Sequence, residues 1–172
     1  MRSIYSILRA SLLVVIAAVS LVFSLTINEM GFFFGVSLLI GAALSGIYLF
    51  MHFDEHVNEK VIMEPLIDAF AGLVILTHPE VSTRFVLTDF SFWMAMNGIL
   101  YLAAGFFNHQ KTSYFWLYVL TGLVTIIFGF TIVNYNDAFL SSVNYVMAFS
   151  LIIYGIINIY LSIYRKNTPL QP

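Results

Sequence analysis

The sequence predicts an all-α polytopic membrane protein with six transmembrane helices, built from three tandem helix hairpins. Of its 172 residues, 60% are hydrophobic and only 9% are charged, and the mean hydropathy is +0.93. A water-soluble domain carries about 25% charged residues, so we expect the outer surface of this chain to face lipid. An internal repeat, described below, predicts the hairpins.

Six apolar segments are long enough to cross a bilayer. A hydrocarbon core about 30 Å thick needs roughly 20 apolar residues of helix. Inside lipid the backbone must bond within its own segment, which favours helices over open strands. The first segment follows basic residues as in a signal peptide, but no cleavage site follows the apolar run Ala10–Leu25, so we expect it to be retained. The predicted spans are 7–26, 31–51, 60–77, 83–107, 114–133 and 138–163.

The loops predict the orientation of the chain. Short polar turns at 26–29, 77–80 and 134–137 lie on one side, and each carries one acidic residue, which suits the positive end of the following helix. The basic residues favour the other side, which holds both termini. That side carries Arg2, Arg9, Lys60, Lys111, Arg165 and Lys166, and the turn side carries only Arg84. The positive-inside rule therefore predicts cytoplasmic termini.

The tryptophans fit this arrangement in different ways. Trp116 lies near the end of a predicted span, as in an interfacial aromatic belt. Trp93 lies too deep in its span for such a belt, so we expect it to pack inside the bundle.

The three hairpins are copies of one unit. The triplets Ser45-Gly46-Ile47, Asn97-Gly98-Ile99 and Tyr154-Gly155-Ile156 recur 52 and 57 residues apart. The second and third copies align at a constant offset of 57, and the first aligns with a one-residue shift. Each copy starts and ends on the same side, so rotation about the membrane normal relates the copies, in a ring or in a row. The single membrane domain, 1–172, divides into repeat 1 (about 4–51), a cytoplasmic loop (52–60), repeat 2 (about 60–107), a loop (108–113), repeat 3 (about 114–165) and a C-terminal tail (166–172).

Glycines mark the faces where we expect helices to meet. Helices in lipid associate where small residues let two backbones approach closely. We expect these contacts within the chain, and the alternative is a seam with a second copy or with another membrane protein. The predicted packing residues are Gly31, Gly35, Gly46, Gly72, Gly98, Gly122, Gly129 and Gly155.

Two motifs carry a family resemblance. Residues 122–129 read Gly-Leu-Val-Thr-Ile-Ile-Phe-Gly, and the turn 76–82 reads Leu-Thr-His-Pro-Glu-Val-Ser. Apolar hairpins with such a first helix and turn, and with Gly-Ile in the second helix, resemble the HdeD-like short-repeat membrane proteins. The resemblance covers all six spans, most clearly 60–165, although Pro65 replaces the first glycine of the second copy. It implies a six-helix protein of the bacterial inner membrane, and the founding member of the family is associated with acid resistance.

Polar residues inside the spans are the candidate functional residues. Glu64 and Asp68 lie four residues apart on one face of the third span, and Asp89 lies in the fourth. Ionisable groups are costly in lipid and suggest function. The third copy has no acid at the equivalent positions, so the fold does not require them. One hypothesis is proton binding and release, with Asn97 as a hydrogen-bond partner. The alternatives are capping or bonding between helices, and cation coordination.

The most polar loop contains a weaker candidate. His52 and His56 have the i, i+4 spacing that can bind a divalent metal, but no third ligand is apparent, and the alternative is a solvated loop. We therefore expect no cofactor. A net charge of −2 gives no case for nucleic acid. The sequence contains no phosphate-binding glycine loop and no nucleophile elbow, so we expect no enzymatic activity.

These observations lead to three functional hypotheses. The first is a non-enzymatic multi-pass inner-membrane protein in acid or envelope stress resistance, as the resemblance implies. The second is a small proton-linked transporter or channel that uses Glu64, Asp68 and Asp89. The third is an accessory subunit whose glycine faces meet another chain. A conduction path requires the three acids to face one polar cavity reachable from both sides, whereas a packing role leaves them paired or isolated.

Overall fold

The computed structural model describes residues 2–51, 59–77, 82–107, 115–135 and 140–167. These residues form six α-helices and no strand, which confirms the predicted all-α class. The helices are α1 (Arg2–Phe23), α2 (Ile27–Met51), α3 (Glu59–Thr77), α4 (Thr83–Phe107), α5 (Phe115–Val133) and α6 (Leu140–Asn167).

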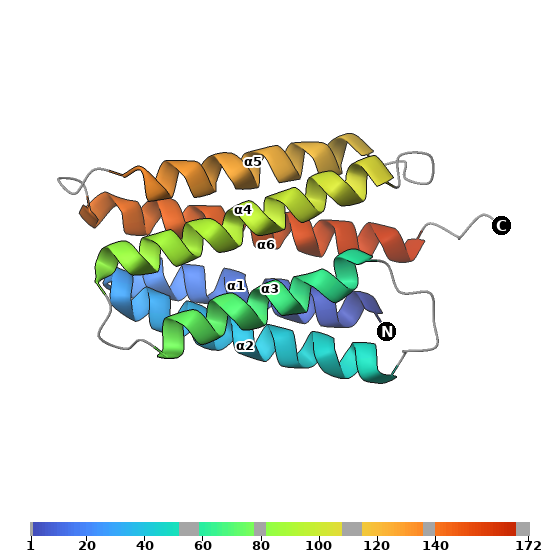
Figure 1. The fold of residues 1–172 in the computed structure, drawn as a ribbon, viewed down its shortest axis with the longest axis horizontal. Helices are drawn as coiled ribbons and strands as arrows, with labels where there is room; N and C mark the ends of the chain where they lie inside the picture. The colour runs from blue at the N-terminus through green and yellow to red at the C-terminus, as the bar shows by residue number, and fades with distance from the viewer. Residues whose placement is uncertain (1, 52–58, 78–81, 108–114, 136–139, 168–172) are drawn as a thin grey trace.

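The six helices lie side by side along the long axis of the molecule (Figure 1). The beginning of α1 and the end of α6 lie at the same end of the bundle. The most extensive contacts join α4 to α5, α1 to α6 and α2 to α3, whereas α5 and α6 touch least among successive helices. Packing therefore runs around a closed circuit in which the last helix returns to the first.

Five of the six described helices are long and apolar enough to cross a membrane, and α3 is the exception. The six predicted spans are therefore supported for five helices, and 60–77 forms the sixth helix without meeting the same criterion. The physical reason is the charge on α3, which carries Glu59, Lys60, Glu64 and Asp68 within a helix of 19 residues. Large apolar side chains such as Val22, Phe50 and Phe107 are exposed around the bundle, as expected for a surface in contact with lipid.

The turn between the first two helices differs from the predicted one. The turn occupies Ser24–Thr26, whereas residues 27–29, predicted as turn, begin α2. The reason is a capping box: the Glu29 backbone N–H donates to Thr26 Oγ1 at 3.3 Å, and the Thr26 N–H donates to Glu29 Oε2 at 2.8 Å. Ser24 has a φ of 49° and ends α1, with the Leu25 N–H donating back to the Ser20 carbonyl at 3.2 Å.

An aromatic cluster fills the centre of the bundle. Trp93 is fully buried, which confirms that it packs inside the bundle, and Trp116 is largely exposed near a helix end. The Trp93 ring lies 5.1 Å from the rings of both Phe34 and Tyr154, centroid to centroid, and Phe34 lies 4.9 Å from Phe90. Side chains of α2, α4 and α6 therefore meet at one point, beside the polar residues described below.

Several glycines lie where two backbones nearly touch. A Cβ added to Gly122 of α5 would lie 2.7 Å from the carbonyl oxygen of Gly98 in α4, too close for any side chain. A Cβ on Gly72 would lie 2.9 Å from the Gly35 carbonyl oxygen. Gly31, Gly129 and Gly155 also lie against a neighbouring helix. Gly46 differs from its expected role: an added Cβ there would meet no atom within 4 Å, so the structure gives Gly46 no packing contact within the described chain.

Candidate functional site: a buried ion-pair network

An ion pair between the first and third helices lies at the centre of the candidate site. Arg9 Nε donates to Asp68 Oδ2 at 2.5 Å, and Arg9 Nη2 donates to Asp68 Oδ1 at 2.8 Å. This two-point geometry is the strongest way in which a guanidinium binds a carboxylate. The Arg9 side chain is 5% exposed and that of Asp68 is 0% exposed. Gly41 of α2 makes room for the pair, because a Cβ there would lie 3.1 Å from Arg9 Cγ.

Neutral side chains from α4 and α6 complete the hydrogen bonding. The Trp93 indole N–H donates to Asp68 Oδ1 at 2.8 Å. The Tyr154 hydroxyl donates to Asn97 Oδ1 at 2.7 Å, and Arg9 Nη2 reaches both groups at 3.4 Å. Asn97 is held in turn by its Nδ2, which donates to the Trp93 carbonyl at 3.0 Å. The arginine–aspartate pair and its neutral partners therefore come from four helices, α1, α3, α4 and α6.

A second ion pair extends the network along α3. Arg9 Nη1 lies 3.4 Å from Glu64 Oε1, and Lys60 Nζ lies 3.1 Å from the same oxygen. Lys60, Glu64 and Asp68 follow one another at i, i+4 spacing, so they occupy one face of α3. The network defined by Arg9, Lys60, Glu64 and Asp68 contains two cations and two anions. Its formal charge is zero, which lowers the cost of placing it inside lipid.

A reciprocal pair of hydrogen bonds ties α4 to α6. Asn97 bonds to Tyr154, and Tyr101 donates to Asn158 one turn further along both helices. The residues of each pair are 57 positions apart, the offset between the second and third copies. Asn97 of the second copy is therefore equivalent to Tyr154 of the third, and Tyr101 is equivalent to Asn158. Each hydrogen bond joins an Asn in one copy to a Tyr at the equivalent position of the other. Asn158 is oriented by its Nδ2, which donates to the Tyr154 carbonyl at 2.8 Å.

The structure brings together three of the four polar residues singled out from the sequence. Glu64, Asp68 and Asn97 belong to one connected network. Asp89 does not: no hydrogen bond or ion pair of the described residues joins it to the network, although it lies one turn before Trp93 in α4. Asp89 is 7% exposed, and its Oδ2 has no hydrogen-bond partner among the described residues.

Sequence reasoning counted Arg9 and Lys60 among the basic residues of the cytoplasmic side, and the structure shows that both take part in the network. Arg9 is buried in the bundle, and Lys60 lies in the first turn of α3, where the predicted span 60–77 begins. A signal was present in the sequence. Arg9 lies inside the first predicted span, where a cation requires a buried anion, and the third span offered two.

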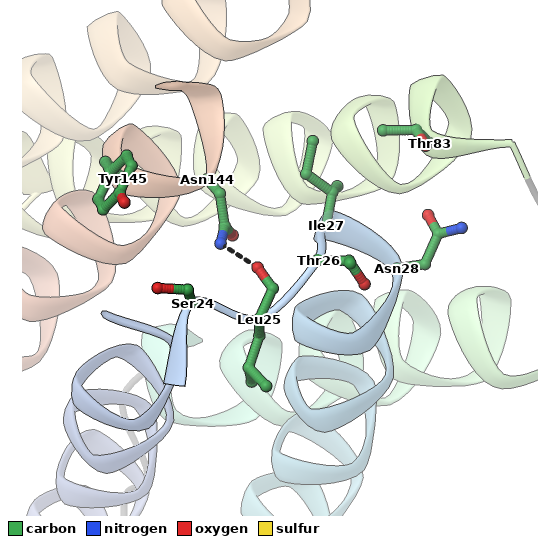
Figure 2. A pocket seen from close by; sticks show the side chains of 8 residues that line it. All are labelled: Ser24, Leu25, Thr26, Ile27, Asn28, Thr83, Asn144 and Tyr145. Carbon is green, nitrogen blue, oxygen red and sulfur yellow. Dashed lines mark hydrogen bonds between the residues drawn. The ribbon is translucent and has the colours of Figure 1, made fainter. Parts of the chain in front are cut away.

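A pocket of about 590 Å³ opens at the other end of the bundle (Figure 2). It lies between the α1–α2 turn, the first residue of α4 and the second turn of α6. Figure 2 shows the Asn144 amide pointing at the Leu25 carbonyl, to which Nδ2 donates at 2.5 Å. None of the acids singled out from the sequence lines it. The lining residues are Ser24, Leu25, Thr26, Ile27, Asn28, Thr83, Asn144 and Tyr145.

The weak metal candidates, His52 and His56, lie outside the described residues, as do Glu80 and Asp137 of the turns. Within the described ranges, no group of three or more His, Asp or Glu side chains is placed to hold a metal ion.

The fold and the network define the class of the protein: a helical membrane protein with paired charges in its interior. A family model described as a short repeat of unknown function (DUF308) matches the chain twice, over residues 63–134 and 120–171. The two matches span more than half of the chain, so the chain belongs to this family, which is that of the HdeD-like membrane proteins. The matches start at 63 and 120, positions 57 apart, as do the second and third copies. No curated protein and no solved structure matches the chain.

Proposed function

We propose that the protein is a non-enzymatic multi-pass protein of the bacterial inner membrane that contributes to resistance against acid or envelope stress. The observation that carries the proposal is the neutral network of ion pairs that Arg9, Lys60, Glu64 and Asp68 form. Asp68 accepts hydrogen bonds from Arg9 and Trp93, and Glu64 lies between Arg9 and Lys60. Acids held in this way bind helices together. Acids that are already bound to cations favour a protein that acts through the membrane or a partner. They argue against a protein that transports a substrate between its helices.

We infer that the bundle consists of three hairpins around a pseudo-threefold axis. The contact pattern supports this arrangement, because the extensive interfaces join the second helix of one hairpin to the first helix of the next, including α6 to α1. The two family matches at an offset of 57 support it for the second and third hairpins. The hydrogen bonds Asn97–Tyr154 and Tyr101–Asn158 support it too, because equivalent positions meet only near a shared axis.

The proposed orientation keeps both termini in the cytoplasm. Arg9 and Lys60 belong to the interior network, so they are left out of the count of basic residues on the two sides of the membrane. The remaining basic residues still favour the side of the termini by four, namely Arg2, Lys111, Arg165 and Lys166, to one, Arg84. That asymmetry has the sign that the positive-inside rule requires.

A second candidate function is proton-linked transport, and Asp89 is the observation that favours it. The alternative built on Glu64, Asp68 and Asp89 together is weakened, since the first two are already bound to cations. Asp89 remains a buried carboxyl whose Oδ2 lacks a hydrogen-bond partner within the described part of the chain. Such intramembrane acids occur in proton relays.

Two measurements on one set of variants distinguish the candidates. The purified chain is reconstituted into vesicles that contain a pH-sensitive dye, and proton flux is followed under an imposed gradient. In parallel, survival of a strain lacking the protein is compared after acid challenge and after envelope stress, with and without the wild-type chain. The matched pair is Asp89→Asn, which removes the buried acid, and Arg84→Gln, which removes an exposed charge elsewhere on α4.

We expect vesicles with the wild-type chain to show the flux of protein-free vesicles, and the wild-type chain to restore survival. If the wild-type chain shows proton flux, and Asp89→Asn abolishes this flux while Arg84→Gln does not, proton-linked transport replaces the stress role as the proposed function. Equal survival with and without the chain, under both stresses, would refute the stress role.

A further inference from the structure

The ammonium group of Lys60 lies in a cage of aromatic rings and a carboxylate. Lys60 Nζ is 3.6 Å from the centroid of the Tyr101 ring, 5.8 Å from that of Tyr118 and 3.1 Å from Glu64 Oε1. We call Tyr101, Tyr118 and Glu64 the ammonium cage. Aromatic faces combined with negative charge are the arrangement by which proteins recognise alkylated ammonium ligands.

The aromatic walls of the cage are held independently of Lys60. Tyr101 is fully buried, and its hydroxyl donates to Asn158 of α6. The Tyr101 and Tyr118 rings lie 5.8 Å apart at an interplanar angle of 42°. Gly105 lets α5 approach α4 here, because a Cβ on Gly105 would lie 3.2 Å from Tyr118 Cβ. The two rings therefore belong to α4 and α5, whereas the cation enters from α3.

Lys60 lies near the end of its helix, at the edge of the bundle. It is the second residue of α3, where the backbone N–H groups of the helix have no intrahelical acceptor and ends fray readily. Its side chain is 12% exposed and that of Glu64 is 14% exposed, so the cage reaches the surface of the bundle. Glu64 also pairs with Arg9, whose Nη1 lies 3.4 Å from Glu64 Oε1.

Charge balance specifies the ligand that would replace Lys60. Without the lysine ammonium the network holds one cation, Arg9, against the two acids Glu64 and Asp68. One monovalent cation restores neutrality, and a divalent metal would exceed it. The ring faces favour a weakly hydrated organic cation over sodium.

We propose that the ammonium cage is a binding site for small monovalent alkylammonium compounds and that Lys60 is its built-in competitor. A ligand that binds only when Lys60 has swung out has an apparent affinity reduced by the fraction of time that the cage is open. This inference stands on the cage geometry and does not require the stress role.

The first test removes the competitor. Binding of tetramethylammonium chloride to the purified full-length chain is measured by calorimetry, with equimolar sodium chloride as the ionic control. Lys60→Ala is compared with Arg84→Ala, which removes an exposed cation elsewhere. We expect Lys60→Ala to bind about tenfold more tightly than wild type, as for a cage that Lys60 fills about 90% of the time. Arg84→Ala should match wild type.

The second test removes the ring face. In the Lys60→Ala background, Tyr101→Phe keeps the aromatic face and loses the hydroxyl, whereas Tyr101→Leu loses both. Tyr101→Phe should retain binding, and Tyr101→Leu should weaken it roughly five- to tenfold, the size of a cation–π contribution. Binding that is the same in both variants would overturn the proposed site.

A third measurement uses the wild-type chain and does not depend on the folding of any variant. Displaced Lys60 becomes available to a water-soluble acylating reagent, and mass spectrometry reports its rate of modification. Tetramethylammonium should accelerate acylation at Lys60, and sodium chloride of equal concentration should not. An unchanged rate, together with no binding by Lys60→Ala, would make the cage a purely structural contact.

Discussion

Replacing Arg9 by Met removes the cation from a carboxylate that has no access to solvent. Asp68 is 0% exposed and would lose both guanidinium hydrogen bonds, at 2.5 and 2.8 Å. One donor would remain, the Trp93 indole N–H at 2.8 Å. Loss of one partner from a buried ion pair costs about 3–5 kcal/mol, because the other charge is left uncompensated. We expect Arg9→Met to lower the free energy of unfolding by about that amount.

The assay is unfolding in mixed micelles at increasing fractions of sodium dodecyl sulfate, followed by helical circular dichroism. The single variant Asp68→Leu and the double variant Arg9→Met/Asp68→Leu complete a double-mutant cycle. Removing both charges eliminates the uncompensated carboxylate, so the double variant should recover at least about 1 kcal/mol relative to Arg9→Met alone. Arg84→Met, at an exposed position, is the control and should stay within about 0.5 kcal/mol of wild type. A double variant as unstable as the sum of its single variants would show that the pair is not coupled.

Further predictions use the same unfolding assay. Gly122→Ala places a Cβ 2.7 Å from the Gly98 carbonyl oxygen, so α4 and α5 must separate, and we expect a loss of about 1–3 kcal/mol. Gly46→Ala adds the same methyl group where nothing lies within 4 Å, and it should cause no loss; equal losses for the two variants would contradict the proposed packing. Trp93→Phe keeps an aromatic ring but removes the indole donor to Asp68, which should cost roughly 1.5–3 kcal/mol. A cost as large as that of removing the arginine would mean that the ring, rather than its N–H, stabilises the site.

The elements were largely predictable from the sequence because each apolar run must bond its own backbone in lipid. The ends of α3 at Thr77 and of α5 at Val133 lie where the predicted spans end. The start of α2 was missed by four residues. Thr26 and Glu29 form a capping box there, and this Thr-x-x-Glu pattern in the sequence marks the start of a helix.

The candidate site was predictable in part. Comparison of the internal copies isolated Glu64 and Asp68, since the third copy has no acid at those positions. It did not identify Arg9, which lies 59 residues from its partner and was counted among the loop charges that orient the chain. It also grouped Asp89 with the other two acids, and the structure separates Asp89 from the network.

The sequence by itself determined that this chain is helical and lies in a membrane, since both conclusions follow from composition summed along each segment. Only the tertiary structure decided which cation neutralises which acid, and that the Lys60 ammonium lies over the Tyr101 ring. The physical reason is that lipid is as apolar as the interior of the bundle. A transmembrane helix therefore carries little contrast between its inner and outer faces, and the neighbours of each face are known only once the helices have packed.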